Sequence, residues 1–185
     1  MLHIHLASIT ETGLELDEVV ALAALPQLQA LSREGDVAFN SPVHVNIHAT
    51  LAGETVVIEG HVEAGVHLTC SRCLGSFDQC IQSDFSVTAI PEPPASSIDS
   101  AEEIELTAED MAVITYDGNS IDLHEEVAQQ ILMALPFNPL CQPSCKGLCS
   151  GCGVDLNQTA CRCVASEAIG PFAVLKTLSL PSKKD

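Results

Sequence analysis

The order of apolar and polar positions predicts mainly strands in the first half of the chain. Alternation of the two residue types is typical of a strand with one buried face. It occurs in five segments, which are Leu2–Leu6, Val43–Ala49, Val56–Val62, Val66–Leu68 and Phe77–Ile90. Leu51–Glu54, which contains a glycine, lies between two of these segments and predicts a chain reversal. We therefore expect an antiparallel meander whose sheet curves toward a small barrel.

Helical spacing is found in two further segments. After Gly13 the apolar residues fall near one face of a helix, and they are Leu16, Val19, Leu22 and Ala23. Because Pro26 interrupts this pattern, we expect a short helix, a break and a second turn up to Leu31. A second helix is expected to be capped by Asp122 and to end before Pro136. Its apolar stripe consists of Val127, Ile131, Leu132 and Leu135, and a strand over Val113–Tyr116 precedes it.

These elements predict an α+β fold with an antiparallel, curved and barrel-like β-sheet, a few helices and a cysteine-rich, zinc-binding C-terminal module. We divide the chain into a β-rich core domain of residues 1–135 and a metal-binding module with a tail over residues 136–185. The core domain includes an acidic loop over residues 91–121 and the helix over residues 122–135. From Pro139 to Cys163, frequent Cys, Gly and Pro residues interrupt the chain, so its order must come from something other than an apolar core.

The charge of the chain excludes a general nucleic-acid-binding surface. Seven Lys and Arg residues stand against 25 Asp and Glu residues, which gives a formal net charge of −18. Phosphate contacts need cations, and no Lys or Arg lies between Arg72 and Lys146. The segment from Pro91 to Glu126 carries 11 acids and is expected to be a solvated loop in large part. Any RNA contact is therefore expected to be local, through Arg72, Lys146, Arg162, Lys176, Lys183 and Lys184.

The sequence predicts a cytoplasmic protein without a membrane attachment. Its N-terminus lacks the basic segment and long apolar stretch of a signal peptide. The apolar runs also fall short of the roughly 18–20 residues that a membrane span needs. In a reducing compartment, closely spaced cysteines are more often metal ligands than disulfides. The odd total of nine cysteines fits a fully paired disulfide framework poorly.

Eight of the nine cysteines fall into two clusters with the spacing of metal ligands. The first cluster is a CxxC formed by Cys70 and Cys73, directly after an apolar strand. The second cluster contains another CxxC followed by a glycine, and it closes with a CxC. Two thiolates separated by two residues converge on one ion, and eight thiolates supply two tetrahedral, all-cysteine zinc sites. The expected ligands are Cys70, Cys73, Cys141, Cys145, Cys149, Cys152, Cys161 and Cys163.

Two ways of sharing the ligands satisfy this pattern. In one, the first CxxC joins Cys149 and Cys152, and the remaining four cysteines close a second site. In the other, the first CxxC joins Cys141 and Cys145, and the second site contains Cys149, Cys152, Cys161 and Cys163. The sequence alone does not choose between them. An iron–sulfur cluster uses the same ligand type, and the spacing excludes it only weakly.

The remaining candidates are expected to have no chemical role. Cys80 lies within a predicted strand and is expected to be a buried small apolar residue. His44 and His48 share one face of their strand with Asn46, and we expect both histidines to be exposed to solvent. No Ser–His–Asp order, phosphate loop or paired-carboxylate site stands out, so neither catalytic residues nor a small-molecule substrate is expected.

Four motifs between Val66 and Leu178 resemble the YceD family. They are a strand leading into Cys-Ser-Arg-Cys-Leu at 70–74, Asp-Leu at 122–123 opening a helix that ends Leu-Met-Ala-Leu-Pro at 132–136, Cys-Lys-Gly-Leu-Cys-Ser-Gly-Cys-Gly-Val-Asp-Leu-Asn at 145–157, and Gly-Pro-Phe-Ala-Val-Leu-Lys-Thr-Leu at 170–178. The third motif is the specific one, whereas the N-terminal third of the chain matches only in its coarse pattern. The resemblance implies a bacterial or organellar protein needed for accumulation of large-subunit ribosomal RNA. It offers no catalytic residues.

We therefore expect a non-enzymatic factor in ribosome biogenesis that contains two structural zinc ions. Its expected partners are ribosomal proteins or a pre-ribosomal particle, with local rRNA contact at most. A strongly acidic surface holds a basic ribosomal protein more readily than it holds RNA. The alternative is a thiol-based redox or metal-responsive regulator that uses the same cysteines.

Overall fold

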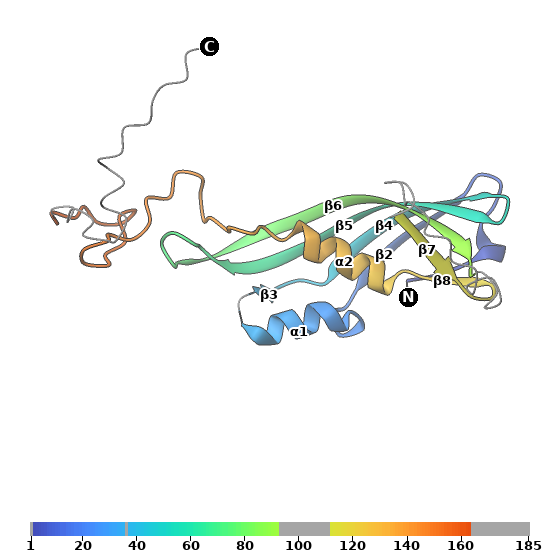
Figure 1. The fold of residues 1–185 in the computed structure, drawn as a ribbon, viewed down its shortest axis with the longest axis horizontal. Coiled ribbons are helices and arrows are strands. Elements are labelled where there is room, and N and C mark those ends of the chain that lie inside the picture. Colours follow the sequence, from blue (N-terminus) through green and yellow to red (C-terminus); the bar gives the residue numbers. More distant parts are fainter. Residues whose placement is uncertain (1, 36, 93–111, 164–185) are drawn as a thin grey trace, which may run out of the picture.

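The computed structural model describes residues 2–35, 37–92 and 112–163 of the 185-residue chain. These residues form an α+β fold (Figure 1). Its strands are β1 (His3–His5), β2 (Leu14–Val20), β3 (Val37–Phe39), β4 (Val43–Ala52), β5 (Thr55–Thr69), β6 (Ser76–Pro91), β7 (Val113–Tyr116) and β8 (Ser120–Asp122). Its α-helices are α1 (Pro26–Glu34) and α2 (His124–Ala134), and the short 3-10 helices η1 and η2 are Leu6–Ser8 and Leu22–Ala24.

The larger of the two sheets is open and mixed. Its strands follow the order β2-β4-β5-β6-β7, and β3 pairs with β5 off this path. Among its paired strands only β6 and β7 are parallel. Within the described residues β2 and β7 are the two edges of the sheet and do not pair with each other. The expected barrel-like closure is therefore wrong, and the expected antiparallel pairing fails at β7, because the chain returns beside β6 in the same direction.

The three central strands confirm the sequence prediction and extend it. The reversal at Leu51–Glu54 joins β4 to β5, with Ala52 paired to Thr55 and Gly53 at a φ of 71°. The two alternating segments that follow are parts of one 15-residue strand, β5. Strand β6 pairs with β5 along 14 residue pairs, so the two strands form one long hairpin. The CxxC at Cys70 and Cys73 lies at the tip of this hairpin.

The helix that the sequence predicts after Gly13 is wrong. Leu14–Val20 form β2, which pairs antiparallel with β4 and places Leu16 opposite Ile47. Leu14 and Leu16 pack against the core, whereas Glu15 lies exposed on the opposite face. Pro26 does not interrupt a helix but begins α1, because its fixed φ and missing N–H are tolerated in a first helical turn.

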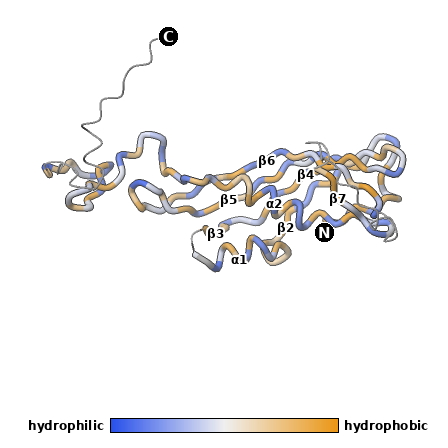
Figure 2. Tube along the Cα trace, viewed as in Figure 1, coloured by the Kyte–Doolittle hydropathy of each residue, from blue (hydrophilic) through white to orange (hydrophobic). Residues whose placement is uncertain are grey.

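One face of the larger sheet is covered by the helices. Helix α2 packs against β5 and β6, and α1 packs against β3 and α2 (Figure 1). Alternate residues of the central strands, such as Ile47 and Ile58, point toward the helices and form the core with Leu28 and Ile131. Apolar and polar colours change along these strands in Figure 2. The opposite face of the sheet, which we call the open face, carries polar side chains in β4, β5 and β6.

The start of α2 follows the prediction with a shift of one residue. Asp122 precedes the N-cap Leu123, and its carboxylate accepts a hydrogen bond from the backbone N–H of His124 (3.0 Å). Of the predicted apolar stripe, Val127 and Ile131 are fully buried, and the other two residues pack at the edge of the core. Neither α1 nor α2 has the length and apolar character needed to cross a bilayer.

Several predicted features lie outside the described residues. These are most of the acidic loop, namely residues 93–111, and the motif at residues 170–178 with the lysines at 176, 183 and 184. The described chain leaves α2 at Ala134 and continues into the cysteine-rich segment, which lies at one end of the molecule (Figure 1).

Candidate metal centres

The eight predicted cysteines gather in two groups of four. The sulfur atoms within each group all lie within 4.8 Å of one another. The first group, site I, contains Cys70, Cys73, Cys141 and Cys145. The second group, site II, contains Cys149, Cys152, Cys161 and Cys163. Of the two arrangements that the sequence leaves open, the structure has the one in which the first CxxC joins the cysteines that follow α2.

Both sites are built on the same kind of CxxC turn. The N–H of the residue after the second cysteine donates to the carbonyl of the first cysteine, at 3.0 Å in site I and 2.8 Å in site II. The N–H of the first cysteine donates to the carbonyl five residues later, at 2.9 Å and 2.8 Å. Leu74 and Gly153 follow the second cysteine, and both have a positive φ, of 58° and 73°. The turn thus requires a left-handed residue, which glycine adopts at little cost and leucine does not.

Each turn directs a backbone N–H toward the sulfur of its first cysteine. The N–H of Arg72 donates to Cys70 Sγ at 3.5 Å, and the N–H of Gly151 donates to Cys149 Sγ at 3.4 Å. Hydrogen bonds of this kind favour the charged form of a thiol. The two turns are therefore prepared to hold a thiolate.

The thiols of site I do not ionise alike. The backbone N–H groups of Cys141 and Cys73 lower the pKa of Cys70 to about 6. Burial, followed by hydrogen bonding with the Cys145 thiol, raises the pKa of Cys141 to about 12. Four adjacent sulfurs cannot all become thiolates unless a cation lies between them, because each negative charge opposes the next.

Site II shows the same division. The backbone N–H groups of Cys152 and Gly151 lower the pKa of Cys149 to about 6. Hydrogen bonding with the Cys161 thiol raises the pKa of Cys163 to about 12, and the Cys152 thiol adds to this shift. Both sets of sulfurs thus have the chemistry of a site that a divalent cation completes.

The distances between sulfurs fit a single tetrahedral ion in site I and are shorter than that fit in site II. In site I the sulfurs of Cys70 and Cys145 are 3.8 Å apart, and those of Cys73 and Cys141 are 3.7 Å apart. In site II two pairs that share Cys161 are separated by 3.3 and 3.4 Å. Zinc–sulfur bonds of ~2.3 Å in a tetrahedron place the sulfurs about 3.8 Å apart. An iron–sulfur cluster fits less well, because several irons and sulfides would have to lie between these cysteines.

Arg72 connects the hairpin tip to the segment that supplies the other half of site I. Its carbonyl accepts a hydrogen bond from the N–H of Leu148 (3.1 Å), and its Nη1 donates to the carbonyl of Cys145 (2.9 Å). The N–H of the neighbouring Ser71 donates to the carbonyl of Pro139 (2.8 Å). The sequence suggests Arg72 only as an RNA contact, whereas the structure shows it joining two segments of the protein.

Asn157 is a contributor to site I that the sequence does not reveal. Its Nδ2 donates to Cys145 Sγ at 3.3 Å, and its Oδ1 accepts from the N–H of Lys146 at 2.8 Å. Asp155 Oδ1 accepts a second hydrogen bond from the same Nδ2 at 2.7 Å. Asn157 therefore links the loop after site II's CxxC to Cys145 of site I, and in the sequence only its place in the cysteine-rich motif indicates this.

Cys80 is not the buried apolar residue that the sequence predicts. It lies on the open face of β6, exposed, and its Sγ donates to Glu63 Oε1 at 3.1 Å. The neighbouring Ile81 is the residue that faces the core. The two histidines predicted to be exposed follow the prediction in part, because His44 is exposed and His48 is half-buried.

A third group of possible metal ligands, His3, Asp122 and His124, also occurs within the described residues. The Asp122 carboxylate already accepts hydrogen bonds from the backbone N–H and from Nδ1 of His124, at 3.0 and 2.5 Å. These contacts occupy Asp122 at the start of α2. We therefore regard this group as part of the helix start.

Comparison with known proteins gives one family. The sequence model described as "Large ribosomal RNA subunit accumulation protein YceD" matches residues 58–179, which include both CxxC turns and α2. Two relatives are named "Large ribosomal RNA subunit accumulation protein YCED homolog 1, chloroplastic". The one from Arabidopsis thaliana is 25% identical over 162 residues, covering 76% of this chain and 50% of the relative.

Mycobacterial proteins described as uncharacterized are also similar. The Mycobacterium leprae protein is 27% identical over 150 residues, covering 80% of this chain and 65% of the relative. One from Mycobacterium tuberculosis is 32% identical over 112 residues, covering 60% and 50%. The chain thus spans only about half to two thirds of the length of these relatives. No solved structure matches.

Proposed function

Because this chain belongs to the YceD family of large ribosomal RNA subunit accumulation proteins, we propose that it is a non-enzymatic factor in ribosome biogenesis with structural zinc. The observation that carries this proposal is the gathering of eight cysteines into two four-sulfur groups. Four protein ligands complete a tetrahedral ion and leave no open position for water or substrate. Both sites therefore suit a structural role better than a catalytic one.

In this proposal zinc holds the two parts of the protein together. The β-rich domain is residues 1–135 and the metal-binding module with its tail is residues 136–185. When bound, each zinc supplies a divalent charge among four thiolates. At site I the chain itself brings Cys70 and Cys73 from the tip of the β5–β6 hairpin to Cys141 and Cys145, which follow α2. At site II the ligands organise a segment in which few side chains are buried.

We propose that the partners are basic ribosomal proteins or a pre-ribosomal particle in the bacterial cytoplasm. The net charge of −18 favours attraction of a cationic protein over attraction of RNA. Three of the four basic residues in the described chain, Arg72, Lys146 and Arg162, lie in or beside the two sites. Any rRNA contact is therefore proposed for this end of the molecule.

Metal analysis tests the zinc sites. Protein purified without oxygen is expected to contain two zinc ions, and the variants Cys73→Ser and Cys152→Ser are expected to retain one each. Cys80→Ser is the matched control, because Cys80 is outside both groups of sulfurs and should leave the zinc content at two. An iron–sulfur absorption band, or metal content that none of these variants changes, would contradict the proposal.

Depletion of the protein in its host tests the ribosomal role. We expect the ratio of large-subunit to small-subunit rRNA to fall on depletion and to recover with the wild-type chain and with Cys80→Ser. Cys73→Ser is expected to fail to restore the ratio, because it opens the connection at site I. An unchanged ratio on depletion would overturn the ribosomal proposal and leave the zinc sites unaffected.

The second candidate is a thiol-based regulator, and the closeness of the sulfurs favours it. Pairs at 3.3–3.8 Å need little movement to form a disulfide. Zinc-loaded protein treated with a mild oxidant distinguishes the two. Reversible release of zinc with a disulfide inside either group, at one of these close pairs or between Cys70 and Cys73, supports the regulator, whereas retained zinc supports the structural role.

A further inference from the structure

The open face of the larger sheet carries a concentration of carboxylates that the zinc sites do not use. Residues paired across neighbouring strands share a face. The register therefore places six acids on the open face, namely Glu15, Asp17, Glu59, Glu63, Asp78 and Asp84. All six are exposed. Among the described residues of β2–β6, the strands that form this face, no Lys or Arg occurs.

Histidines alternate with these acids across the strands. In the β4–β5 pairing, His44 is opposite Glu63 and His48 is opposite Glu59. In the β5–β6 pairing, His61 Nδ1 lies 2.6 Å from Asp84 Oδ1, and His67 makes the same contact with Asp78 at 2.8 Å. Among the residues that the structure describes, the carboxylates give this face a charge of −6, and no Lys or Arg lies on it. Its carboxylates thus lack the Lys and Arg partners that exposed acids on a sheet often have.

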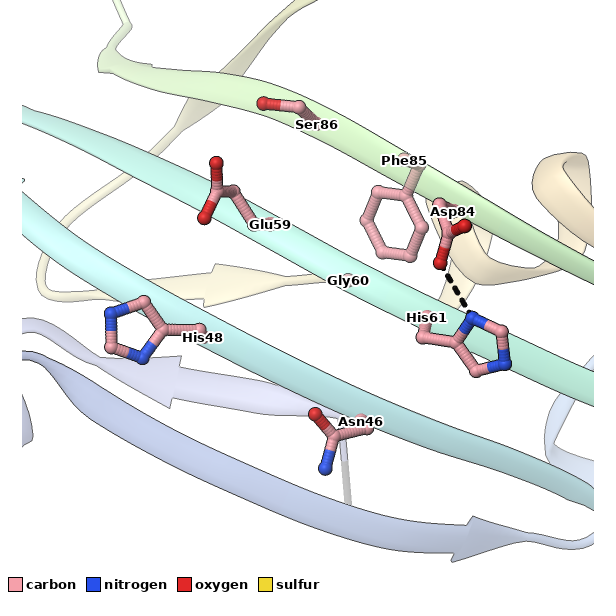
Figure 3. Close-up of a pocket in the computed structure, with 8 residues that line it drawn as sticks. All are labelled: Asn46, His48, Glu59, Gly60, His61, Asp84, Phe85 and Ser86. Carbon is pink, nitrogen blue, oxygen red and sulfur yellow. Dashed lines mark hydrogen bonds and ion pairs between the residues drawn. The ribbon is translucent and has the colours of Figure 1, made fainter.

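A shallow hollow lies near the centre of this face. It measures about 540 Å³, and Asn46, His48, Glu59, His61, Asp84 and Ser86 line it with Gly60 and Phe85. Figure 3 shows the polar side chains of β4, β5 and β6 around it, with Glu59 and His48 at one end and Asp84 and His61 at the other. The two carboxylates, the Asn46 amide and the Ser86 hydroxyl supply hydrogen-bond acceptors. Such a lining suits the cationic end of a Lys or Arg side chain.

We propose that the open face binds an extended, basic segment of a partner protein, with one Lys or Arg side chain in the hollow beside Glu59 and Asp84. Charge complementarity is the basis, because six carboxylates without cations attract a cationic chain. An extended segment can place alternate side chains on such a flat surface. The inference rests on the proposed function only in naming a ribosomal protein as the source of the segment.

The same charge pattern argues against RNA as the occupant. In the described part of the chain, a phosphate backbone would meet six like charges and no Lys or Arg on this face. The basic residues Arg72, Lys146 and Arg162 belong to the cysteine-rich end instead. The structure thus separates a face suited to a basic protein from the only described end with several cations.

A fluorescent peptide of alternating Lys and Thr provides the test. A peptide of about 12 residues spans roughly 40 Å when extended. Its binding is compared between two variants that each remove four negative charges. The face variant carries Glu15→Gln, Asp17→Asn, Glu59→Gln and Glu63→Gln. The control variant changes four exposed acids that do not lie on the open face. It carries Glu11→Gln, Glu54→Gln, Glu92→Gln and Asp117→Asn.

The face variant is expected to bind the peptide about tenfold more weakly or worse at low ionic strength, and the control variant within about threefold of wild type. Binding by the wild type should weaken as salt is added. Equal losses in both variants would show general charge attraction and overturn the inference. Binding of a single-stranded rRNA fragment that the face variant weakens would overturn it in favour of RNA.

Two further measurements separate this inference from the proposed function. Both variants should retain two zinc ions and the wild-type melting temperature, which shows that the fold is intact. If the wild-type chain restores rRNA accumulation but shows no face-dependent peptide binding, only the inference fails. If depletion of the protein leaves the rRNA ratio unchanged while peptide binding depends on the face, only the ribosomal role fails.

Discussion

Sites I and II contain the same CxxC turn on two different supports. In site I the turn is the tip of a hairpin made of the 15-residue β5 and the 16-residue β6, and Cys70 is fully buried. In site II all four cysteines come from residues 149–163, and Cys149 is only half-buried. The turns share their hydrogen bonds and the lowered pKa of their first cysteine, so the difference between them is in what surrounds them.

The number of residues between the paired cysteines gives an estimate of how much each site stabilises the fold. Cys73 and Cys141, whose sulfurs are neighbours in site I, are 68 residues apart, whereas Cys149 and Cys161 in site II are 12 apart. Closing the longer loop costs the unfolded chain about 1.5 kcal/mol more in entropy. A metal ion that holds site I closed therefore constrains the unfolded chain more strongly. Site I is expected to matter for the whole fold and site II for its own segment.

Removing one ligand from each site is expected to have the largest and most unequal effect. Cys73→Ser should lower the free energy of unfolding of the sheet by at least about 3 kcal/mol, a fraction of the ~10–16 kcal/mol with which structural zinc binds. Cys152→Ser should change it by no more than roughly 0.5 kcal/mol, because site II ligands are outside the described apolar core. Chemical denaturation followed by circular dichroism measures both. Equal losses of stability in the two variants would show that the sheet depends on site I no more than on site II.

Two glycines at the same φ of 73° test the packing around site I. A Cβ on Gly147 would lie 3.0 Å from the carbonyl oxygen of Arg72, whereas a Cβ on Gly153 would meet no atom within 4 Å. Gly153→Ala should cost about 1–2 kcal/mol for the left-handed backbone alone. Gly147→Ala should cost about 1–3 kcal/mol more, because Arg72 must move. Hydrogen exchange measures each cost locally, at the hairpin tip for Gly147→Ala and in the site II turn for Gly153→Ala. Equal costs would show that Arg72 does not hold the two segments together.

Alkylation of the metal-free, reduced protein separates ionisation from burial. A pKa of about 6 makes both Cys70 and Cys149 largely thiolate at pH 7. Since the ordinary value is 9.0, each thiolate stabilises the fold fully above pH 9, and this stabilisation is lost as the pH falls through 6. Cys149 should nevertheless react roughly tenfold faster than the buried Cys70. A local opening exposes Cys149, whereas Cys70 is exposed only by a wider opening of the hairpin. Mass spectrometry of timed samples measures both rates, and equal rates would contradict protection by the hairpin.

The smallest expected effect concerns Leu74, the counterpart of Gly153. Leu74 has a φ of 58° and a side chain that is 65% exposed, so glycine relieves its backbone and removes little packing. Leu74→Gly should raise the free energy of unfolding by up to about 1 kcal/mol. This is the backbone strain relieved minus the conformational entropy that glycine adds to the unfolded chain. Leu51→Gly is the control and should destabilise the protein, because Leu51 lies in the extended strand β4. Calorimetry of both variants gives the signs.

The sequence predicts the parts of the fold that depend on local patterns. The alternation in Val43–Ala49 and Phe77–Ile90 identifies β4 and β6 because one face of each is buried. The same alternation, applied to β6, places Cys80 on the face opposite Ile81. The prediction that Cys80 is buried rests on its small apolar character instead, and it is wrong. The sequence predicts a helix where β2 lies, because Leu16 and Val19 fit a helical face as well as a strand. The segment forms a strand because it pairs with β4, and this contact between residues far apart in the sequence cannot be seen in the local pattern.

The candidate sites divide in the same way. The spacing of cysteines identifies the eight sulfurs that the structure gathers, because each CxxC turn is formed by neighbouring residues. The spacing does not show which clusters share a site. That choice depends on contacts such as the one between Ser71 and Pro139, which the fold of β5, β6 and α2 brings together. The sequence does not indicate the role of Asn157 for the same reason, because its contact with Cys145 also depends on the fold.

The parallel pairing of β7 with β6 makes the acidic segment an insertion point. The chain leaves the sheet at Pro91 and re-enters it at Val113, opposite Thr88; β7 then runs along β6 until Tyr116 lies opposite Pro91 and accepts a hydrogen bond from the N–H of Glu92 (3.0 Å). Since both anchors are held in neighbouring strands of one sheet, doubling the length of chain between them costs only ~0.6 kcal/mol. A whole reporter domain or affinity tag can therefore be grafted there, far along the chain from both groups of cysteines, and the protein can be followed in the cell without altering either terminus.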